Sequence, residues 1–353
     1  MPDNWFKDPS PFIVHGNRSL ETRLSRLDSL MTPNELFFVR NNSRTLELDP
    51  ADWSLVVGGD GVESEVRLSY ADLQAMPRRS VSCYLECGGN QRAMFEIVMG
   101  RAATGTQWMT GGVGMAEWSG VPLLEVLDRA GIREAAVDVL LVGRDVESAE
   151  RGFRKAISID KAMDPDSILA LEMNGVPLPP DHGYPLRAIV PGYVGSANIK
   201  WLGEIRVSND KVWTRNNTTS YVLIGPDYPP EGESEGVPAV WQTIKSPLAL
   251  DWPATLPVGP QTLRGYASSP HAPISRVEWS VDDGATWQEA GLLEPGPRYT
   301  WVRYELDWDA PAGVGTIMTR ATDAAGNTQP DEIPFNEKGY LFNLPLPHPV
   351  RVS

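Results

Sequence analysis

The chain has 353 residues, of which 41% are hydrophobic and 22% are charged, and its formal net charge is −15. This length predicts two domains, and the composition is that of an ordinary globular protein with a sizeable core. The excess of acid argues against broad nucleic-acid binding, which needs a basic surface. It suits solubility and the attraction of a basic protein partner.

Cysteine and histidine usage narrows the class further. Two cysteines in so long a chain exclude a disulfide framework, and the four histidines are too scattered to predict a histidine-rich zinc site. No apolar run reaches membrane-spanning length, and the first residues lack the apolar core of a signal peptide. We therefore expect no membrane association and a cytoplasmic protein as the chain stands, or a periplasmic one if an export leader has been trimmed.

The first 50 residues are expected to be irregular, apart from a short helix suggested by leucines at 20, 24, 27 and 30. From about 53 to 207 the pattern predicts short strands alternating with short helices. The strands are expected at 54–58, 80–85 and 137–142. A serine cap predicts a helix at 69–76, and a closing glycine predicts another at 122–130.

The composition and the spacing of apolar residues change in the last third of the chain. Residues 226–238 are rich in proline, glycine and acid, which is typical of a loop or linker. After about 245, period-two alternation at 274–281 and 299–308 predicts strands, and Asp283-Gly284 predicts a hairpin turn. Short strands with turn signals between them indicate a β-sandwich.

Cys87 lies in the run Cys83-Tyr-Leu-Glu-Cys87-Gly-Gly-Asn-Gln-Arg92, directly after a predicted strand. A thiolate is a soft ligand for metals that bind sulfur, and the glycines allow close backbone approach. Asn90 and Arg92 offer donors to an anion at that metal. A free cysteine is also commonly a small buried hydrophobe, so both interpretations are open for Cys87 from these residues alone.

Further clusters carry groups suited to anions. Arg40 and two amides follow an apolar strand, an arrangement that fits either an oxyanion site or an ordinary surface arginine. Trp108 lies in a glycine-rich segment that fits a pocket wall or packing. One region rich in proline and glycine carries four donors for a phosphate: His182, Arg187, Ser196 and Lys200. Turn geometry alone would explain the glycines of this region. No GxGxxG or Walker pattern indicates a nucleotide.

Six motifs follow one another along the chain: Phe38-Val-Arg-Asn41, Cys87-Gly-Gly-Asn-Gln-Arg92, Gly120-Val-Pro-Leu123, Met173-Asn-Gly175, Asp181-His-Gly-Tyr-Pro-Leu-Arg187 and Lys200-Trp-Leu-Gly203. In this order they resemble the sulfite oxidase family of molybdenum enzymes. The run from Arg276 to Trp287 is similar to the family's immunoglobulin-like dimerisation domain. The resemblance extends from about Leu36 to Pro330.

The resemblance implies an α+β fold class, with a mixed α/β molybdopterin-binding catalytic domain at 1–238 and an immunoglobulin-like β-sandwich dimerisation domain at 239–353. It implies molybdenum held by a pyranopterin (molybdopterin), with Cys87 as the protein ligand to the metal. Further residues match the family's cofactor contacts: Asn41, Asp145, His182, Arg187, Ser196 and Lys200. Others match its substrate pocket: Arg40, Arg92, Tyr221 and Trp108.

The chain also departs from the family's usual motifs. Asn42 stands where a histidine is usual, and Gly88 and Gln91 replace an alanine and an arginine. His271 lies where vertebrate-type enzymes offer a third anion-binding arginine, and is expected to substitute for it at lower charge.

The expected function is oxidation of sulfite to sulfate by a homodimer. The electrons are expected to pass to a separate acceptor such as a cytochrome c, with no haem in this chain. Alternatives on the same scaffold are oxo transfer to or from nitrate, a carrier-bound sulfur group or a sulfoxide. A non-catalytic assembly protein is a further alternative. A thiol redox protein using Cys83 and Cys87 lacks a thioredoxin-like context.

Overall fold

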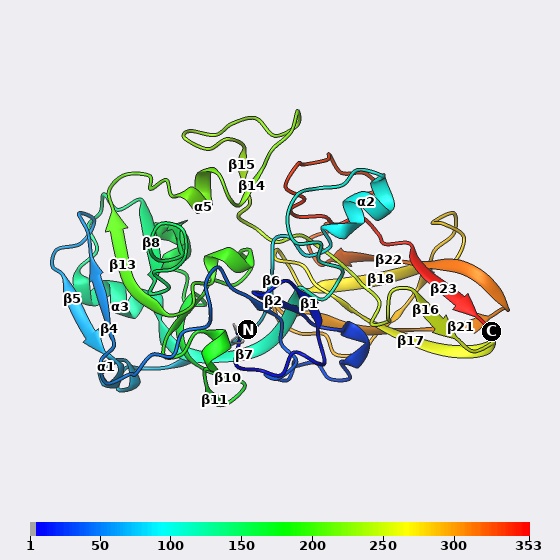
Figure 1. Cartoon of the computed structure of the whole chain (residues 1–353), viewed down its shortest axis with the longest axis horizontal. Helices are drawn as coiled ribbons and strands as arrows, with labels where there is room; N and C mark the ends of the chain where they lie inside the picture. The colour runs from blue at the N-terminus through cyan, green and yellow to red at the C-terminus, as the bar shows by residue number, and fades with distance from the viewer. Residues whose placement is uncertain (1–4) are drawn as a thin grey trace.

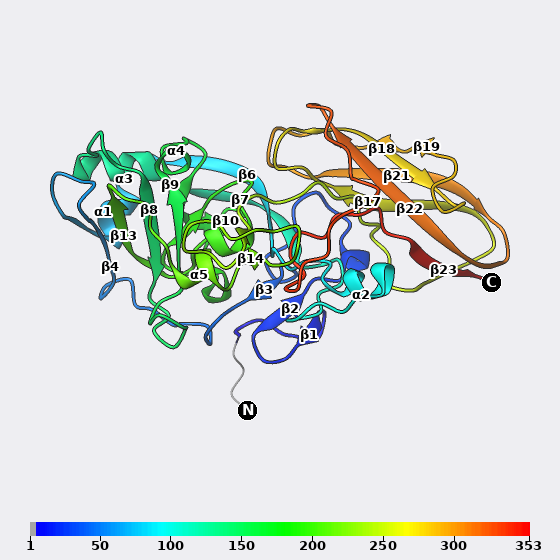
Figure 2. The same cartoon turned by 90° about the horizontal axis from the view of Figure 1, so that it is seen from above.

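The computed structural model describes residues 5–353, which form two parts side by side along the longest axis of the molecule (Figure 1). The first part mixes strands and short helices, and the second is a β-sandwich that contains the C-terminus. Short N-terminal strands lie between the two parts in both views (Figure 2). Within residues 5–353, no helix is long and apolar enough to cross a membrane.

One five-stranded sheet of the first part has the order β5-β4-β13-β8-β9. Its strands are β4 (Ser54–Gly58), β5 (Val66–Ser69), β8 (Asp138–Gly143), β9 (Arg154–Ser158) and β13 (Leu202–Ser208). The pair β4 and β13 is parallel, and the other neighbours are antiparallel. Its apolar side chains, such as Leu55, Leu141 and Ile205, are fully buried in the largest core cluster.

Helices cover this sheet where the sequence predicts them. In α1 (Tyr70–Gln74), the Ser69 hydroxyl accepts from the Asp72 N–H while the Asp72 carboxylate accepts from the Ser69 N–H, so the predicted serine cap is confirmed. The predicted glycine stop of α3 (Leu123–Ala130) is also confirmed, because Gly131 has φ +70°. Short α4 (Ile159–Ala162) follows β9.

A second sheet leads to the predicted metal-binding cysteine. Its path is β11-β10-β7-β6, and β12 also pairs with β10. The strands are β6 (Arg79–Glu86), β7 (Val113–Pro122), β10 (Ile168–Met173), β11 (Val176–Pro177) and β12 (Arg187–Ile189). Cys87 follows β6 directly, and its N–H donates to the Gly112 carbonyl at 2.8 Å. The end of β6 is thereby held in place, so the thiol has a defined direction.

The helix predicted from the N-terminal leucines is wrong. The structure has a small sheet of three strands, β1 (Ile13–His15), β2 (Ser19–Glu21) and β3 (Val39–Arg40). A single 3₁₀ turn, η1 (Leu24–Arg26), lies between β2 and β3 in the sequence. Leu20 pairs with Val39 across β2 and β3. The carboxylate of Glu21 accepts from the N–H groups of Met109 and Gly111. These long-range contacts outweigh the helical spacing of the leucines.

The remaining elements before the sandwich strands are short. They are α2 (Ala93–Met99), α5 (Arg215–Thr218), η2 (Pro180–His182), η3 (Gly195–Ala197) and the strand pair β14 (Val222–Leu223) and β15 (Val237–Pro238). Apart from β15, the segment expected to be a linker forms turns and isolated bridges. Loops rather than regular elements therefore carry much of the backbone that surrounds the candidate site.

The second part is the predicted sandwich of two sheets. One has the order β16-β23-β22-β18-β19 and the other β17-β21-β20. The strands are β16 (Ala254–Leu256), β17 (Gly259–Ala267), β18 (Ile274–Ser280), β19 (Gln288–Glu289), β20 (Gly291–Leu292), β21 (Val302–Ala310), β22 (Gly313–Asp323) and β23 (His348–Val352). Asp283 and Gly284 both have positive φ, as the predicted hairpin turn requires.

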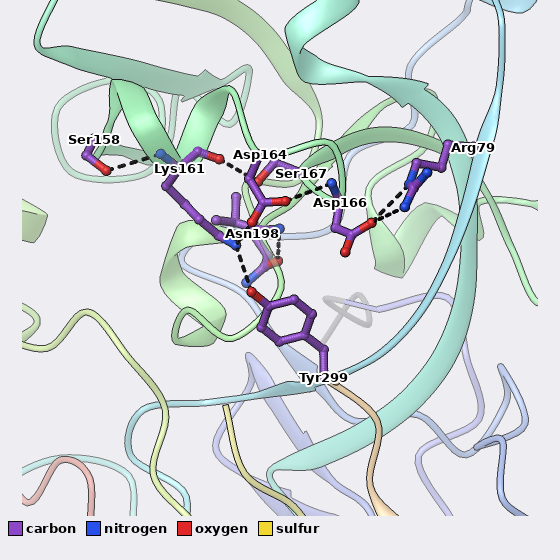
Figure 3. Close-up of polar contacts among 9 residues, drawn as sticks. Arg79, Ser158, Lys161, Asp164, Asp166, Ser167, Asn198 and Tyr299 are labelled. Atoms are coloured by element: carbon purple, nitrogen blue, oxygen red, sulfur yellow. Dashed lines mark hydrogen bonds and ion pairs between the residues drawn. The ribbon is translucent and has the colours of Figure 1, made fainter. Parts of the chain in front are cut away.

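Polar contacts join the two parts. Lys161 of α4 forms an ion pair with Asp164 at 2.8 Å, and its ammonium lies 3.4 Å from the hydroxyl of Tyr299, which precedes β21 (Figure 3). Closer to the site, the buried carboxylate of Glu86 forms an ion pair with Lys245. Glu86 is the last residue of β6, so this ion pair ties the residue before Cys87 to the segment that leads into the sandwich.

Candidate active site

One cavity in the first part brings together residues from widely separated motifs. Its wall contains most of the predicted site residues, namely Arg40, Asn41, Cys87, Asp145, His182, Arg187, Ser196, Lys200 and Tyr221. They lie at the end of β3 or after β3, β6 and β8, within η2, β12 and η3, or just before β13 and β14. Because each comes from the end of an element or from an adjoining loop, the sheet framework fixes their relative positions.

The two cysteines have different environments. Cys87 is half-buried and contributes to the cavity wall. Cys83 is fully buried inside the second sheet, and this burial raises the pKa of its thiol to about 12. A thiol with so high a pKa stays protonated at neutral pH, whereas a metal ligand must be the thiolate. Of the two thiols, Cys87 is the one placed to bind a metal.

Arg40 and Tyr221 form the wall where this cavity adjoins a second one. The Arg40 guanidinium donates to the Asn42 side-chain oxygen at 3.1 Å and to the Asn41 carbonyl. Asn42 in turn donates to the Tyr221 hydroxyl at 3.5 Å. The residue that replaces the family's usual histidine therefore links the arginine to the tyrosine.

A group of cationic and donor side chains forms another wall. Arg187 is buried, with its guanidinium 5.2 Å from the Trp118 ring centroid, and burial lowers its pKa to about 9. Lys200 donates to the Asn41 side chain and to the Asp181 carbonyl, and burial lowers its pKa well below the usual range. Arg187 therefore stays charged at neutral pH, and an anion beside Lys200 would favour its ammonium form.

His182 is held from behind by a residue that the sequence analysis missed. The Lys7 amine lies 2.8 Å from His182 Nε2 and also donates to the carbonyls of Asn34 and Phe37. Burial, reinforced by nearby cations, lowers the pKa of His182 well below 6.5, so the imidazole is neutral. Burial lowers the pKa of Lys7 to about 7. In its ammonium form Lys7 has no acceptor, so it donates to Nε2 and leaves the ring proton on Nδ1.

The wall also contains buried donors without partners. These donors allow the fit of a pterin phosphate to be tested on the structure. Arg187 Nε and Ser196 Oγ are buried and make no hydrogen bond in the described chain. Such groups cost free energy unless a ligand satisfies them. A phosphate offers oxygen acceptors that fit these donors and the neighbouring Lys200. The residues present therefore suit a pterin phosphate at this end and a sulfur-bound metal at Cys87.

Three predicted substrate-pocket residues do not contribute to this cavity: Arg92, Trp108 and His271. Trp108 is buried between His15 and Phe38, with ring centroids 5.2 and 6.1 Å away. His271 lies 5.8 Å from the Trp241 ring, in the loop before β18. Their predicted roles stay predictions.

Arg92 lies beside the site, in a cradle of glycines. It donates to the carbonyls of Lys338 and Thr106 and lies 4.8 Å from the Tyr340 ring centroid. A Cβ on Gly89 would come within 2.5 Å of its guanidinium. The second glycine after Cys87 is therefore needed for Arg92 to pack, a steric role that the motif alone does not reveal.

A second cavity adjoins the first on the side of Arg40 and Tyr221. It adds the cationic side chains of Arg18, Arg215 and Lys338, together with Tyr340. Lys338 and Tyr340 come from the segment that follows the sandwich strand β22, so both ends of the chain contribute to this mouth. A cationic mouth on a chain of charge −15 favours approach by an anion.

Comparison with known proteins agrees with this arrangement. Residues 42–215 match the family model described as "Oxidoreductase molybdopterin binding domain", and residues 253–349 match "Mo-co oxidoreductase dimerisation domain". The chain is 34% identical to mitochondrial sulfite oxidase of Rattus norvegicus, over 90% of this chain and 60% of that protein. It is 33% identical to sulfite oxidase of Gallus gallus, over 89% of this chain and 72% of that protein.

A solved structure is also similar. The sulfane dehydrogenase SoxCD from Paracoccus pantotrophus superposes with a TM-score of 0.82 at 27% identity, covering 93% of this chain and 82% of that one. The chain spans about 60% of the length of the mammalian sulfite oxidases that it matches. With a molybdopterin-binding domain, a dimerisation domain and relatives above 30% identity, this chain belongs to the sulfite oxidase family of molybdopterin oxidoreductases.

Proposed function

We propose that this chain oxidises sulfite to sulfate with a molybdenum cofactor and passes the electrons to a separate acceptor such as a cytochrome c. The observation that carries the proposal is the meeting of Cys87, Arg40 and Tyr221 on a cavity whose other wall holds His182, Arg187 and Lys200. In the overall reaction sulfite gains an oxygen atom from water, and two protons and two electrons leave.

Each wall has a role in this proposal. The Cys87 thiolate would bind the metal, while Arg187, Ser196 and Lys200 would hold the pterin phosphate. When bound, the cofactor supplies the oxygen transfer and takes up the two electrons. Arg40 would offset the desolvation of sulfite and orient it with a planar guanidinium. The Tyr221 hydroxyl, 3.5 Å from Asn42, would donate to a sulfite or sulfate oxygen beside it.

A steady-state screen tests the substrate and the acceptor together. Molybdenum-loaded protein would be assayed with sulfite, and separately with nitrate plus a reductant. Sulfite oxidation would be followed with cytochrome c, ferricyanide and oxygen as acceptors. We expect turnover of sulfite with cytochrome c or ferricyanide. Nitrate reduction without sulfite oxidation would replace the proposed substrate, and no turnover of either by loaded protein would contradict the proposal.

The metal ligand has a matched control in the same chain. Cys87→Ser should abolish sulfite oxidation while the pterin stays bound, because the metal loses its soft ligand. Cys83→Ala should keep activity, since Cys83 is buried away from the cavity. Metal analysis, pterin fluorescence and turnover would be measured for both variants. Full activity of Cys87→Ser would show that this cysteine is not the required ligand.

A carrier-bound sulfur group is the second candidate substrate. The second cavity favours it, because Arg18, Arg215 and Lys338 extend the cationic surface outward beyond what sulfite alone requires. Rates with sulfite and with a peptide-bound S-sulfonate would separate the two. We further propose a homodimer formed through the sandwich, on the basis of the dimerisation-domain match. Light scattering of purified protein would measure its mass.

A further inference from the structure

A buried lysine lies beneath the candidate active-site tyrosine. Lys155 is the second residue of β9 and is 2% exposed. Its Nζ lies 5.3 Å from the centroid of the Tyr221 ring. Tyr221 contributes to both cavities, whereas Lys155 contributes to neither. The lysine therefore reaches the cavity walls through Tyr221 and through Asn216, which lines the second cavity.

The hydrogen bonds of Lys155 tie it to the backbone on either side of Tyr221. Nζ donates to the carbonyl of Asn216 at 3.3 Å and to that of Ala239 at 3.2 Å. Ala239 is itself paired with Tyr221, since its N–H donates to the Tyr221 carbonyl at 2.9 Å. One amine thus joins β9, helix α5 and the segment that carries the tyrosine.

No carboxylate compensates this amine. Within residues 5–353, Lys155 forms no ion pair, and burial is the sole cause of a pKa lowered from 10.5 to about 7. A buried amine without a counter-charge destabilises a fold. Its presence here calls for a role other than stability.

We propose that Lys155 is a positioning residue for Tyr221: its ammonium, held by the Asn216 and Ala239 carbonyls, fixes the orientation of the ring. This rests on the proposed role of Tyr221 in sulfite oxidation. An ammonium has three N–H donors, and with two on carbonyls the third can point to the negative face of the ring. A neutral amine has two N–H groups and a lone pair, so one of these contacts is lost.

Other titratable and charged groups line the cavities together with Tyr221, among them Arg40 and Lys200 in the first and Lys338 in the second. The comparison with Lys155→Met separates their effect on the ring from that of Lys155. Arg154, the preceding residue of β9, donates to the carbonyls of Gly152 and Glu150. On α5, the backbone N–H of the exposed Arg215 donates to the Glu150 carboxylate. On β8, the carboxylate of Asp138 accepts from the Val212 N–H. The Tyr340 ring lies 5.7 Å from the Tyr221 ring, centroid to centroid, and burial raises the pKa of Tyr340, which stays neutral.

A spectroscopic test needs neither metal nor substrate. Fluorotyrosine placed at position 221 of the full chain would report the ring environment by ¹⁹F NMR as the pH passes through about 7. We expect a resonance shift in the parent protein that is absent in Lys155→Met, which keeps an unbranched side chain of similar length but removes the charge. Lys211→Met is the matched control, because Lys211 is exposed and lies 5.0 Å from the ring of Trp213. It should keep the shift.

Kinetics supply the second test. Lys155→Met should lower kcat about 30-fold, the rate equivalent of one desolvated cation–π contact. The KM for sulfite should stay unchanged, because Arg40 still binds the anion. In a Tyr221→Phe background the same substitution should cost no further kcat. Circular dichroism and molybdenum content would confirm that each variant is folded and loaded.

The outcomes separate this proposal from the proposed function. A folded Lys155→Met protein with unchanged kcat, or with the parent ¹⁹F titration, overturns the role of Lys155. If Lys155→Met does not fold, absence of the ¹⁹F shift in the parent protein overturns it. If the parent chain oxidises no sulfite, the proposed function fails, while the ¹⁹F shift still decides whether Lys155 orients the ring.

Discussion

Among single side chains, Arg40 gives the most direct test of substrate binding. Arg40→Gln should raise the KM for sulfite about 10- to 100-fold, because a charge-assisted hydrogen bond contributes about 1.5–3 kcal/mol. The change in kcat should be smaller. Steady-state kinetics on loaded enzyme measures both constants. Arg67→Gln, which changes an exposed arginine that donates to Ser54, should leave both unchanged. An unchanged KM for Arg40→Gln would contradict its role.

Motif residues were predictable, but the residues that support them were not. The ordered motifs are sufficient to predict that Cys87, His182 and Lys200 share a site, and the structure places all three on one cavity. No sequence pattern predicts that Lys7, far away along the chain, lies behind His182. Lys155 likewise gives no signal, since a lysine in a strand is ordinarily expected on the solvent face.

At the level of secondary structure, the buried lysine of β9 should lower the free energy of unfolding in a way that depends on pH. Lys155 has a pKa of about 7 when folded and 10.5 as its ordinary value, so the unfolded chain binds more protons between these pH values. Stability should therefore rise with pH across this window and be lowest below it. Relative to Lys155→Met, the parent protein should gain several kcal/mol, at most about 5, from pH 7 to 10.5.

Urea unfolding of both proteins at several pH values would measure this difference. Comparing the two proteins is necessary because other groups, such as tyrosines, also titrate at high pH. A constant difference in the free energy of unfolding across the window would show that Lys155 does not change its protonation there. The expected sign is opposite to that of a lysine stabilised by an ion pair.

Elements with local signals were predicted well, and those decided by distant contacts were not. The capped α1 and the glycine-terminated α3 depend on a few adjacent residues, and the Asp283-Gly284 turn needs only its own backbone conformation. The leucines near residue 20 have helical spacing, yet β2 forms because Leu20 pairs with Val39. Helix propensity is weak enough for such pairing to prevail.

For the whole molecule, the buried pair of Glu86 and Lys245 should couple the two parts energetically. Lys245→Met would leave the Glu86 carboxylate buried without its cation, at a cost of about 3–5 kcal/mol. The double variant Glu86→Gln, Lys245→Met should recover most of this loss, because a neutral amide can still accept from Asn90. Urea unfolding would measure both variants.

An exposed ion pair provides the comparison. Arg78→Met, which breaks the partly exposed pair with Glu172, should cost at most about 1 kcal/mol. If Lys245→Met cost no more than Arg78→Met, the buried pair would not be coupling the two parts. If the double variant were as unstable as Lys245→Met alone, the loss would come from packing rather than from an unpaired charge.

The loop after β6 is made early during synthesis but closed late. The Gly88 carbonyl accepts from the Leu341 N–H, and the Glu86 carboxylate pairs with Lys245. Both residues that flank Cys87 therefore have partners in the last third of the chain. Because a ribosome releases the N-terminal residues first, the nascent first part keeps this loop open until the C-terminal segment has emerged. We therefore expect metal insertion to follow completion of the polypeptide, and we expect a chain cut short after the first part to lack these contacts on either side of Cys87.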